Sequence, residues 1–121
     1  MSIDTTTAVQ EIAFAIPLLP GKTETDRAAM ISCWRGERRD EHAESRRRLG
    51  ITRESVWIEQ TPAGDVVVVA LAARDLEAAL AGMASSQEPF DCWFREHVLE
   101  VHGVDVAEPL PPLEQVLDYR T

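Results

Sequence analysis

Residues 66–73 form a run of eight consecutive apolar residues, which limits how this chain can fold more than any other feature. The run is too short to cross a bilayer as a helix, which takes about 20 residues. Its four valines favour a β-strand, and we predict one over residues 66–72 that lacks a polar face. Such a strand needs apolar cover on both faces of its sheet.

The other segments alternate between strand and helix patterns. By periodicity and turn residues we expect strands at 9–19, 52–60 and 113–119, and helices at 23–49, 74–83 and 90–102. Gly36 is a point where the long helix can kink or divide, and Gly50 ends it. Residues 1–8 are expected to be a flexible leader, and residues 9–121 a single domain.

This order, β-α-β-β-α-α-β, predicts an α+β fold with a four-stranded antiparallel sheet and helices on one face. The second face of the sheet then faces water, although the 66–72 strand is apolar on both faces and the first strand nearly so. No predicted element is left to cover that face. We therefore expect a homodimer formed through the sheet face.

Four segments carry a resemblance to a known fold: 14–22, 46–51, 89–94 and 102–105. With the element order, they resemble the dimeric α/β-barrel superfamily of ferredoxin-like monomers, which includes antibiotic-biosynthesis monooxygenases, muconolactone isomerases and polyketide cyclases. Within it, the chain is most similar to a group of small bacterial proteins with no established activity. The resemblance covers nearly the whole chain in element order but not in motif. It implies a dimeric α/β barrel and leaves the activity open.

The net charge of −9 argues against nucleic acid as a partner, because a phosphate backbone repels an acidic protein. Seven of the twelve basic residues nevertheless lie between Arg35 and Arg53. This cluster can bind a phosphate or carboxylate, or it can be the solvated surface and end of a helix.

The first residues lack a basic stretch and an apolar stretch, so they do not match a secretory signal, and no segment predicts a membrane anchor. Cys33 and Cys92 do not form a disulfide framework or a metal-binding spacing. We interpret both as reduced thiols, which favours a cytoplasmic protein.

Candidate site residues come from two helices. Arg38 and His42 are one turn apart on a stripe expected to face the sheet, which comprises Ile31, Trp34, Arg38, His42, Ser45 and Leu49. Trp93 and His97 are one turn apart on the 90–102 helix. Both stripes are expected to face the same sheet, which places a pocket between sheet and helices with Trp34 and Trp93 as walls and Arg38, His42 and His97 as its polar groups.

Each of these residues also has a structural interpretation. Arg38 can pair with Glu41 or Glu59, and His42 can bond to a carbonyl group. Trp93 can be a core residue and His97 a satisfied edge residue, while Asp91 at the start of its helix compensates the helix dipole. No metal-binding spacing, GxGxxG, P-loop or GxSxG motif is present, so we expect neither a metal nor a cofactor.

Two functions remain open at this point. One is a protein that binds a small apolar or aromatic molecule between sheet and helices without turnover. The alternative is a cofactor-independent monooxygenase, isomerase or cyclase acting on a small organic substrate. The second requires Arg38, His42 and His97 to converge on one cavity.

Overall fold

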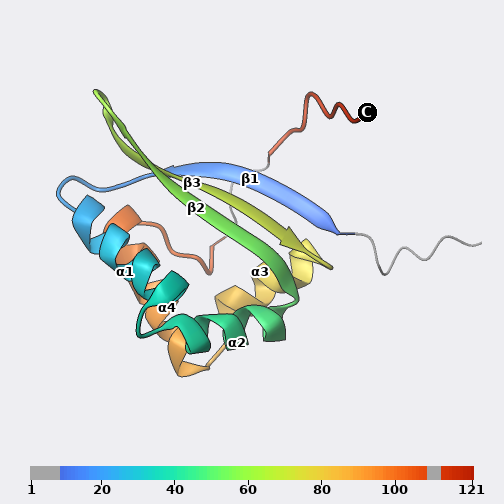
Figure 1. Cartoon of the computed structure of the whole chain (residues 1–121), viewed down its shortest axis with the longest axis horizontal. Coiled ribbons are helices and arrows are strands. Elements are labelled where there is room, and N and C mark those ends of the chain that lie inside the picture. Colours follow the sequence, from blue (N-terminus) through green and yellow to red (C-terminus); the bar gives the residue numbers. More distant parts are fainter. Residues whose placement is uncertain (1–8, 109–112) are drawn as a thin grey trace, which may run out of the picture.

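The computed structural model describes residues 9–108 and 113–121. Along the chain its elements are β1 (Gln10–Pro17), α1 (Thr23–Arg35), α2 (Arg39–Leu49), β2 (Ile51–Thr61), β3 (Gly64–Ala73), α3 (Leu76–Ser85) and α4 (Pro89–His102). The strands form one layer and the helices lie together on one face of it (Figure 1). The α+β class predicted from the sequence is therefore confirmed.

The sheet has three strands, not the four that were predicted. Its order is β1-β3-β2, and both pairs are antiparallel. The segment expected as a strand, residues 113–119, forms neither helix nor strand, although Gln115 lies near Ala13 and Ala70 on the open face of the sheet. Two features disfavour its pairing: the glutamate, glutamine and aspartate it contains are poor strand formers, and Ala13 and Ala15 of β1 give little side-chain surface for cross-strand packing.

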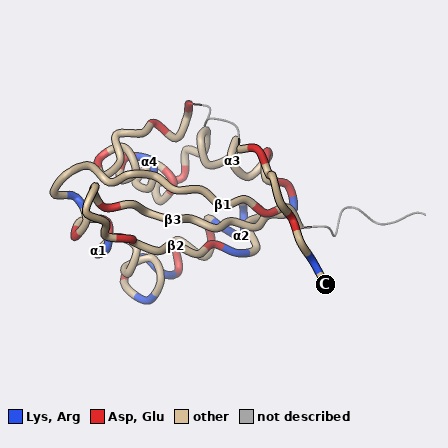
Figure 2. Tube along the Cα trace, turned by 90° about the horizontal axis from the view of Figure 1, so that it is seen from above, with Lys and Arg blue, Asp and Glu red and all other residues tan. Residues whose placement is uncertain are grey.

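The all-apolar strand β3 occupies the centre of the sheet. Val67, Leu71 and Ala73 point toward the helices and are buried. Val68 and Ala70 point to the opposite, open face and are half-buried between the neighbouring strands. Seen from above, β1 and β3 carry few charged residues along their length (Figure 2). The expectation that β3 lacks a polar face agrees with this position.

The long helix expected at 23–49 is divided at Gly36, as the sequence allowed. Gly36 has an extended backbone (φ −121°, ψ −152°), and α2 starts in a new direction at Arg39. Because of this break, one continuous stripe cannot face the sheet. Asp26, Ala29 and Cys33 are the buried residues of α1. Ile31 and Trp34, expected to face inward, are exposed instead.

The apolar core lies between the sheet and α3 and α4. Ile51, Leu71, Ala73, Ala79 and Met83 form its larger cluster. Within the described parts of the chain, none of the helices is long and apolar enough to cross a membrane. The predicted leader at 1–8 lies outside the described residues.

Candidate functional site

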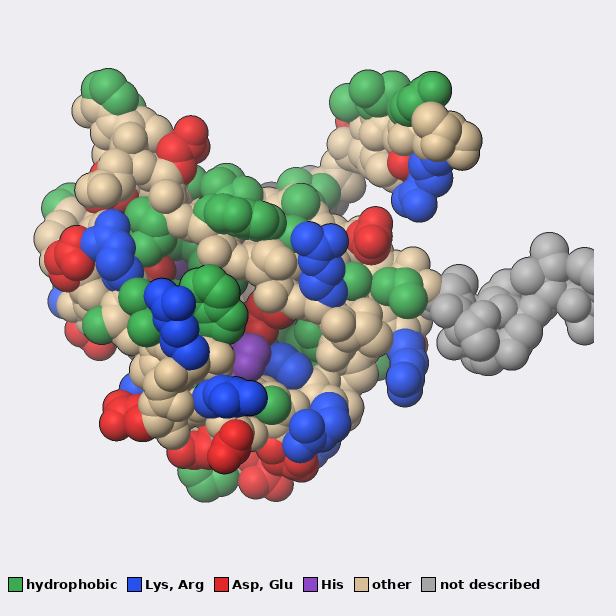
Figure 3. Space-filling view, viewed as in Figure 1, with side chains coloured by type: hydrophobic (Ala, Val, Ile, Leu, Met, Phe, Trp, Pro, Cys, Tyr) green, Lys and Arg blue, Asp and Glu red, His purple; other side chains and the backbone are tan. Residues whose placement is uncertain are grey.

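A groove of about 780 Å³ follows the outer edge of β2, where this strand faces α1 and α2. We call it the β2 groove. Side chains from both faces of β2 line it, so it curves around the edge of the strand. Its lining comprises Arg27, Met30, Ile31, Cys33, Trp34, Arg39, His42, Ala43, Glu54, Ser55, Val56, Trp57, Ile58 and Phe94. Figure 3 shows the hollowed face, with a histidine lying between hydrophobic and basic side chains.

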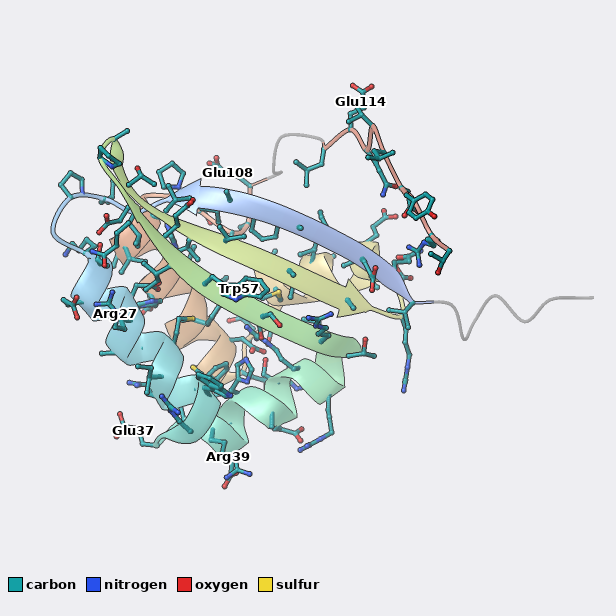
Figure 4. The ribbon with its side chains drawn as sticks, turned by 45° about the horizontal axis from the view of Figure 1, so that its top comes forward. Arg27, Glu37, Arg39, Trp57, Glu108 and Glu114 are labelled. Atoms are coloured by element: carbon teal, nitrogen blue, oxygen red, sulfur yellow. The ribbon has the colours of Figure 1, made fainter. Side chains whose placement is uncertain are left out.

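Two tryptophans border the groove. Trp34, near the end of α1, is 71% exposed, and Trp57, in the middle of β2, is 52% exposed. Trp57 is in register with Val68 of β3, so it lies on the open face of the sheet, as Figure 4 also shows. Two exposed aromatic side chains beside one hollow form an apolar patch, which is more informative than a single exposed residue.

The polar part of the groove is a network around Glu54. Nε2 of His42 donates to Oε1 of Glu54 at 2.6 Å. Arg46 donates to both carboxylate oxygens, from Nε to Oε1 at 2.9 Å and from Nη2 to Oε2 at 3.2 Å. Two residues of α2 therefore hold one carboxylate of β2.

Glu54 remains ionised over the whole ordinary pH range. Burial by itself raises the pKa of its carboxyl group. The hydrogen bond from His42 and the charge and hydrogen bonds of Arg46 act in the opposite direction and outweigh burial, so the pKa falls from 4.5 to about 2. The ionised Glu54 fixes the orientation of the imidazole of His42.

One ring nitrogen of His42 has no partner among the described residues. Its Nε2 is occupied by Glu54, while Nδ1 has no hydrogen-bond partner within residues 9–108 and 113–121. Nδ1 is accessible, because in these residues only Oδ2 of Asp26 is both buried and unpaired among side-chain oxygens and nitrogens. Since His42 lines the β2 groove, Nδ1 can bond to a hydroxyl or carbonyl group of a bound molecule.

The structure brings two of the five predicted site residues to the groove, Trp34 and His42. The other three form a separate stack. The guanidinium carbon of Arg38 lies 4.1 Å from the ring centre of Trp93, and that ring is stacked on His97 with centroids 5.5 Å apart. Arg38, His42 and His97 therefore do not converge on one cavity.

The structure gives Arg38, His42 and His97 other partners or positions than the structural interpretations expected. Arg38 bonds to Ser32 and to its neighbour Glu37, not to Glu41 or Glu59. His42 bonds to the carboxylate of Glu54, not to a carbonyl group. His97 is buried and bonds to Asp26, so it is not an edge residue.

Sequence reasoning missed Glu54, Arg46 and Trp57. Glu54 alternates with Val56 and Ile58, so it is the one carboxylate on the apolar side of its strand. A charged side chain among apolar ones needs a partner, so the alternation pattern could have identified Glu54 from the sequence. The partner, Arg46, was not identifiable, because it depends on how α2 is turned after the break at Gly36.

Asp91 is another buried carboxylate, and its partners belong to the fold itself. Ser45, Ser86 and Arg48 all donate to it. Burial raises the pKa of its carboxyl group, but the hydrogen bonds from the two serines and from Arg48 outweigh burial, and the pKa is lowered. These bonds join α2, the start of α4 and the loop between α3 and α4.

Among the described residues there is no group of three or more histidine, cysteine, aspartate or glutamate side chains that could hold a metal ion. In comparisons with known proteins, no protein-family model, no curated protein and no solved structure matches the chain.

Proposed function

We propose that this protein binds a small, flat organic molecule in the β2 groove. Its volume of about 780 Å³ is within the roughly 300–1,000 Å³ of small-molecule sites. Apolar residues of α1 and β2 form its walls, and its polar groups are concentrated around His42 and Glu54. An apolar hollow with a few fixed polar groups is typical of such sites.

The two exposed tryptophans are the observation that carries this proposal. Trp34 and Trp57 come from different elements, yet both line the groove. Indole rings have large flat faces, which bind the faces or edges of other aromatic rings. A ligand with one or two fused rings covers this apolar surface, and a hydroxyl or carbonyl group on it bonds to Nδ1 of His42.

The test compares two probes, 2-naphthol and naphthalene, which differ by one hydroxyl group. Binding is followed through two-dimensional NMR spectra of the full chain. We expect 2-naphthol to shift resonances of α1, α2 and β2 and to bind about tenfold more tightly than naphthalene, as one hydrogen bond of about 1.4 kcal/mol implies.

Two variants test whether the probes bind in the groove or on any exposed apolar surface. Trp34→Ala should weaken the binding of both probes. Leu99→Ala is a matched control, because Leu99 is an exposed apolar residue of α4 outside the groove. The proposal fails if neither probe shifts groove resonances, or if Leu99→Ala weakens them as much as Trp34→Ala.

The second candidate function is a cofactor-independent enzyme, a monooxygenase, isomerase or cyclase. Arg38 and His97 lie outside the groove, so the three-residue site expected from the sequence is excluded, and His42 is the one of the three that could move a proton there. The pairing of His42 with an ionised Glu54 favours it, because a carboxylate behind an imidazole fixes the orientation of the ring toward a substrate. The test is deuterium exchange into 2-tetralone, a flat ketone with acidic C–H bonds, in heavy water. Exchange above the buffer rate that disappears in His42→Leu supports turnover, and exchange at the buffer rate argues against it.

We also infer a homodimer formed through the open face of the sheet. Glu11, Ala72 and Arg53 are in register across the three strands and share this face. A second copy related by a two-fold axis parallel to the strands brings Arg53 of each copy opposite Glu11 of the other. Valine and alanine side chains of the two β3 strands then meet at the centre, and β1 of each copy lies opposite β2 of the other.

Sedimentation equilibrium tests the dimer. We expect twice the 13.5 kDa of one chain at micromolar concentration. Arg53→Glu should raise the dissociation constant, and the double variant Arg53→Glu with Glu11→Arg should restore it. A 13.5 kDa species throughout contradicts the inference.

A cytoplasmic location belongs to the same proposal and is supported by the two unpaired thiols, Cys33 and Cys92.

A further inference from the structure

The lining of the β2 groove carries an unbalanced positive charge. Its charged side chains are Arg27, Arg39 and Glu54. Glu54 is neutralised by the buried guanidinium of Arg46, and Arg27 is paired with Glu24. The guanidinium of Arg39 is exposed and has neither an ion pair nor a hydrogen bond within residues 9–108 and 113–121. The groove therefore contains one arginine for which the described chain supplies no partner.

This property distinguishes Arg39 from most arginines around it. Besides the two pairs above, the ion pairs of α2 and the residue before it are Arg38–Glu37, Arg47–Glu44 and Arg48–Asp91. In α1 and α2, Arg35 is the other arginine without a carboxylate partner among the described residues, and its guanidinium carbon lies 4.6 Å from the ring centre of Trp34. The chain has 21 acidic and 12 basic residues, so a shortage of carboxylates does not explain two unpaired arginines beside one groove.

Arg39 lies close to the other binding groups of the groove. Arg39 and His42 are three residues apart in α2, which places their Cβ atoms about 5–6 Å from each other. Both line the groove, and Met30, Ile31 and Trp34 of α1 supply part of its apolar wall. Figure 3 shows basic side chains beside the histidine in the hollow. A flat ring against the apolar wall can therefore present a substituent to Arg39.

A carboxylate is the substituent that matches this arginine. A guanidinium has N–H donors and no acceptor, and it forms two parallel hydrogen bonds with a planar carboxylate. A phosphate group fits less well, because its charge of about −1.5 to −2 at pH 7 would be repelled by the ionised Glu54 in the same lining. One unpaired arginine in the lining balances a single negative charge.

We propose that the ligand of the β2 groove is an aromatic carboxylate. Its ring lies against Trp34, and its carboxylate accepts hydrogen bonds from the guanidinium of Arg39. Arg35 holds the indole ring of Trp34 in place through their cation–π contact. The inference rests on the small-molecule site proposed above, and it assigns that site a class of ligand.

The test compares 2-naphthoate with 2-naphthamide, which have nearly the same shape but differ in charge at pH 7. Their affinities are measured by NMR titration of the full chain, as for 2-naphthol. We expect 2-naphthoate to bind about tenfold more tightly than 2-naphthamide at low ionic strength, as one charge-assisted hydrogen-bonded pair implies. The difference should shrink at high ionic strength, because salt screens an exposed ion pair.

Three variants locate the charge that is responsible. Arg39→Gln should lower the affinity for 2-naphthoate about tenfold and leave the affinity for 2-naphthamide unchanged. Arg39→Lys keeps the charge but loses the paired hydrogen bonds, so it should retain part of the preference. Arg47→Gln is the matched control, because it removes the same charge from an exposed position of α2 outside the groove, and it should change neither affinity.

Two results overturn the inference: 2-naphthoate binds no more tightly than 2-naphthamide, or Arg47→Gln lowers its affinity as much as Arg39→Gln does. The binding of 2-naphthol then shows which proposal has failed. If 2-naphthol shifts groove resonances, only the class of ligand is wrong. If none of the three probes shifts them, the groove is not a small-molecule site either.

Discussion

Nε2 of His97 lies 2.8 Å from Oδ1 of Asp26, and this buried contact joins α4 to α1. Asp26 is 2% exposed, and its second oxygen has no hydrogen-bond partner among the described residues. Removing one member of a buried pair leaves the other unsatisfied, which costs about 3–5 kcal/mol.

We therefore expect His97→Leu to lower the free energy of unfolding by about 3 kcal/mol in urea titrations. The double variant Asp26→Leu with His97→Leu should lose less than the sum of the two single variants, because no polar group is then left unpaired. Additive losses contradict a direct interaction.

Acid should destabilise the protein through Glu54. Its pKa is lowered from 4.5 to about 2, so the folded state favours the ionised form. This stabilisation, roughly 3 kcal/mol, is complete above pH 4.5 and disappears as the pH falls toward 2. Glu54→Gln should be less stable at pH 7 and lose less stability between pH 5 and 2. Asp91, whose pKa is also lowered, keeps a share of the slope in this variant. An unchanged slope in Glu54→Gln contradicts the assignment.

Leucine substitutions should distinguish the structural role of Arg38 from the binding role proposed for His42. Arg38→Leu removes a cation–π contact with Trp93 outside the groove, so we expect about 1 kcal/mol lower stability and unchanged 2-naphthol affinity. His42→Leu removes the accessible Nδ1, so the affinity should fall about tenfold. Thermal melting and NMR titration give the two quantities. Equal loss of affinity in both variants is the contrary result.

Gly50 ends α2 with a left-handed backbone (φ 75°, ψ 18°). No atom lies within 4 Å of a Cβ built there, so the backbone conformation alone opposes substitution. Gly50→Ala should reduce stability by about 1 kcal/mol, and Gly50→Asn by less, because asparagine adopts this conformation more readily. Equal losses in urea titrations point to a different cause.

Salt-dependent binding of DNA or RNA should be absent. The net charge of −9 opposes the release of counterions that drives such binding. Fluorescence anisotropy of a labelled oligonucleotide at physiological salt should stay constant up to high protein concentration. A rise that disappears with added salt indicates that the arginines between Arg35 and Arg53 outweigh the net charge.

The sequence predicts local structure better than the orientation of helices. The strand at β3 and the helix stop at Gly50 follow from residue type and turn chemistry alone. The inward stripe of α1 and α2 does not, since the break at Gly36 rotates α2 independently of α1 and leaves Trp34 outside the core.

The candidate site was predictable in part for the same reason. His42 and Trp34 line the β2 groove, but the groove is at the edge of β2 and not beneath the sheet. Arg38 and His97 were expected in a pocket because polar groups on an inward stripe need partners. They have such partners in the protein itself, Trp93 and Asp26. Periodicity shows that a buried polar residue needs a partner, but it does not identify that partner.

The position of β3 between its two neighbours also determines the order in which the sheet can assemble. β2 and β3 follow each other directly, so their hairpin closes a short loop, an event of about 1–10 μs in peptides. β1 also pairs with β3, but α1, α2 and β2 separate these two strands in the sequence. Closing that long loop has the larger entropic cost, so we expect docking of β1 to limit the folding rate. Until β1 docks, one edge of the most apolar strand is open to other chains, and aggregation during refolding should increase with protein concentration.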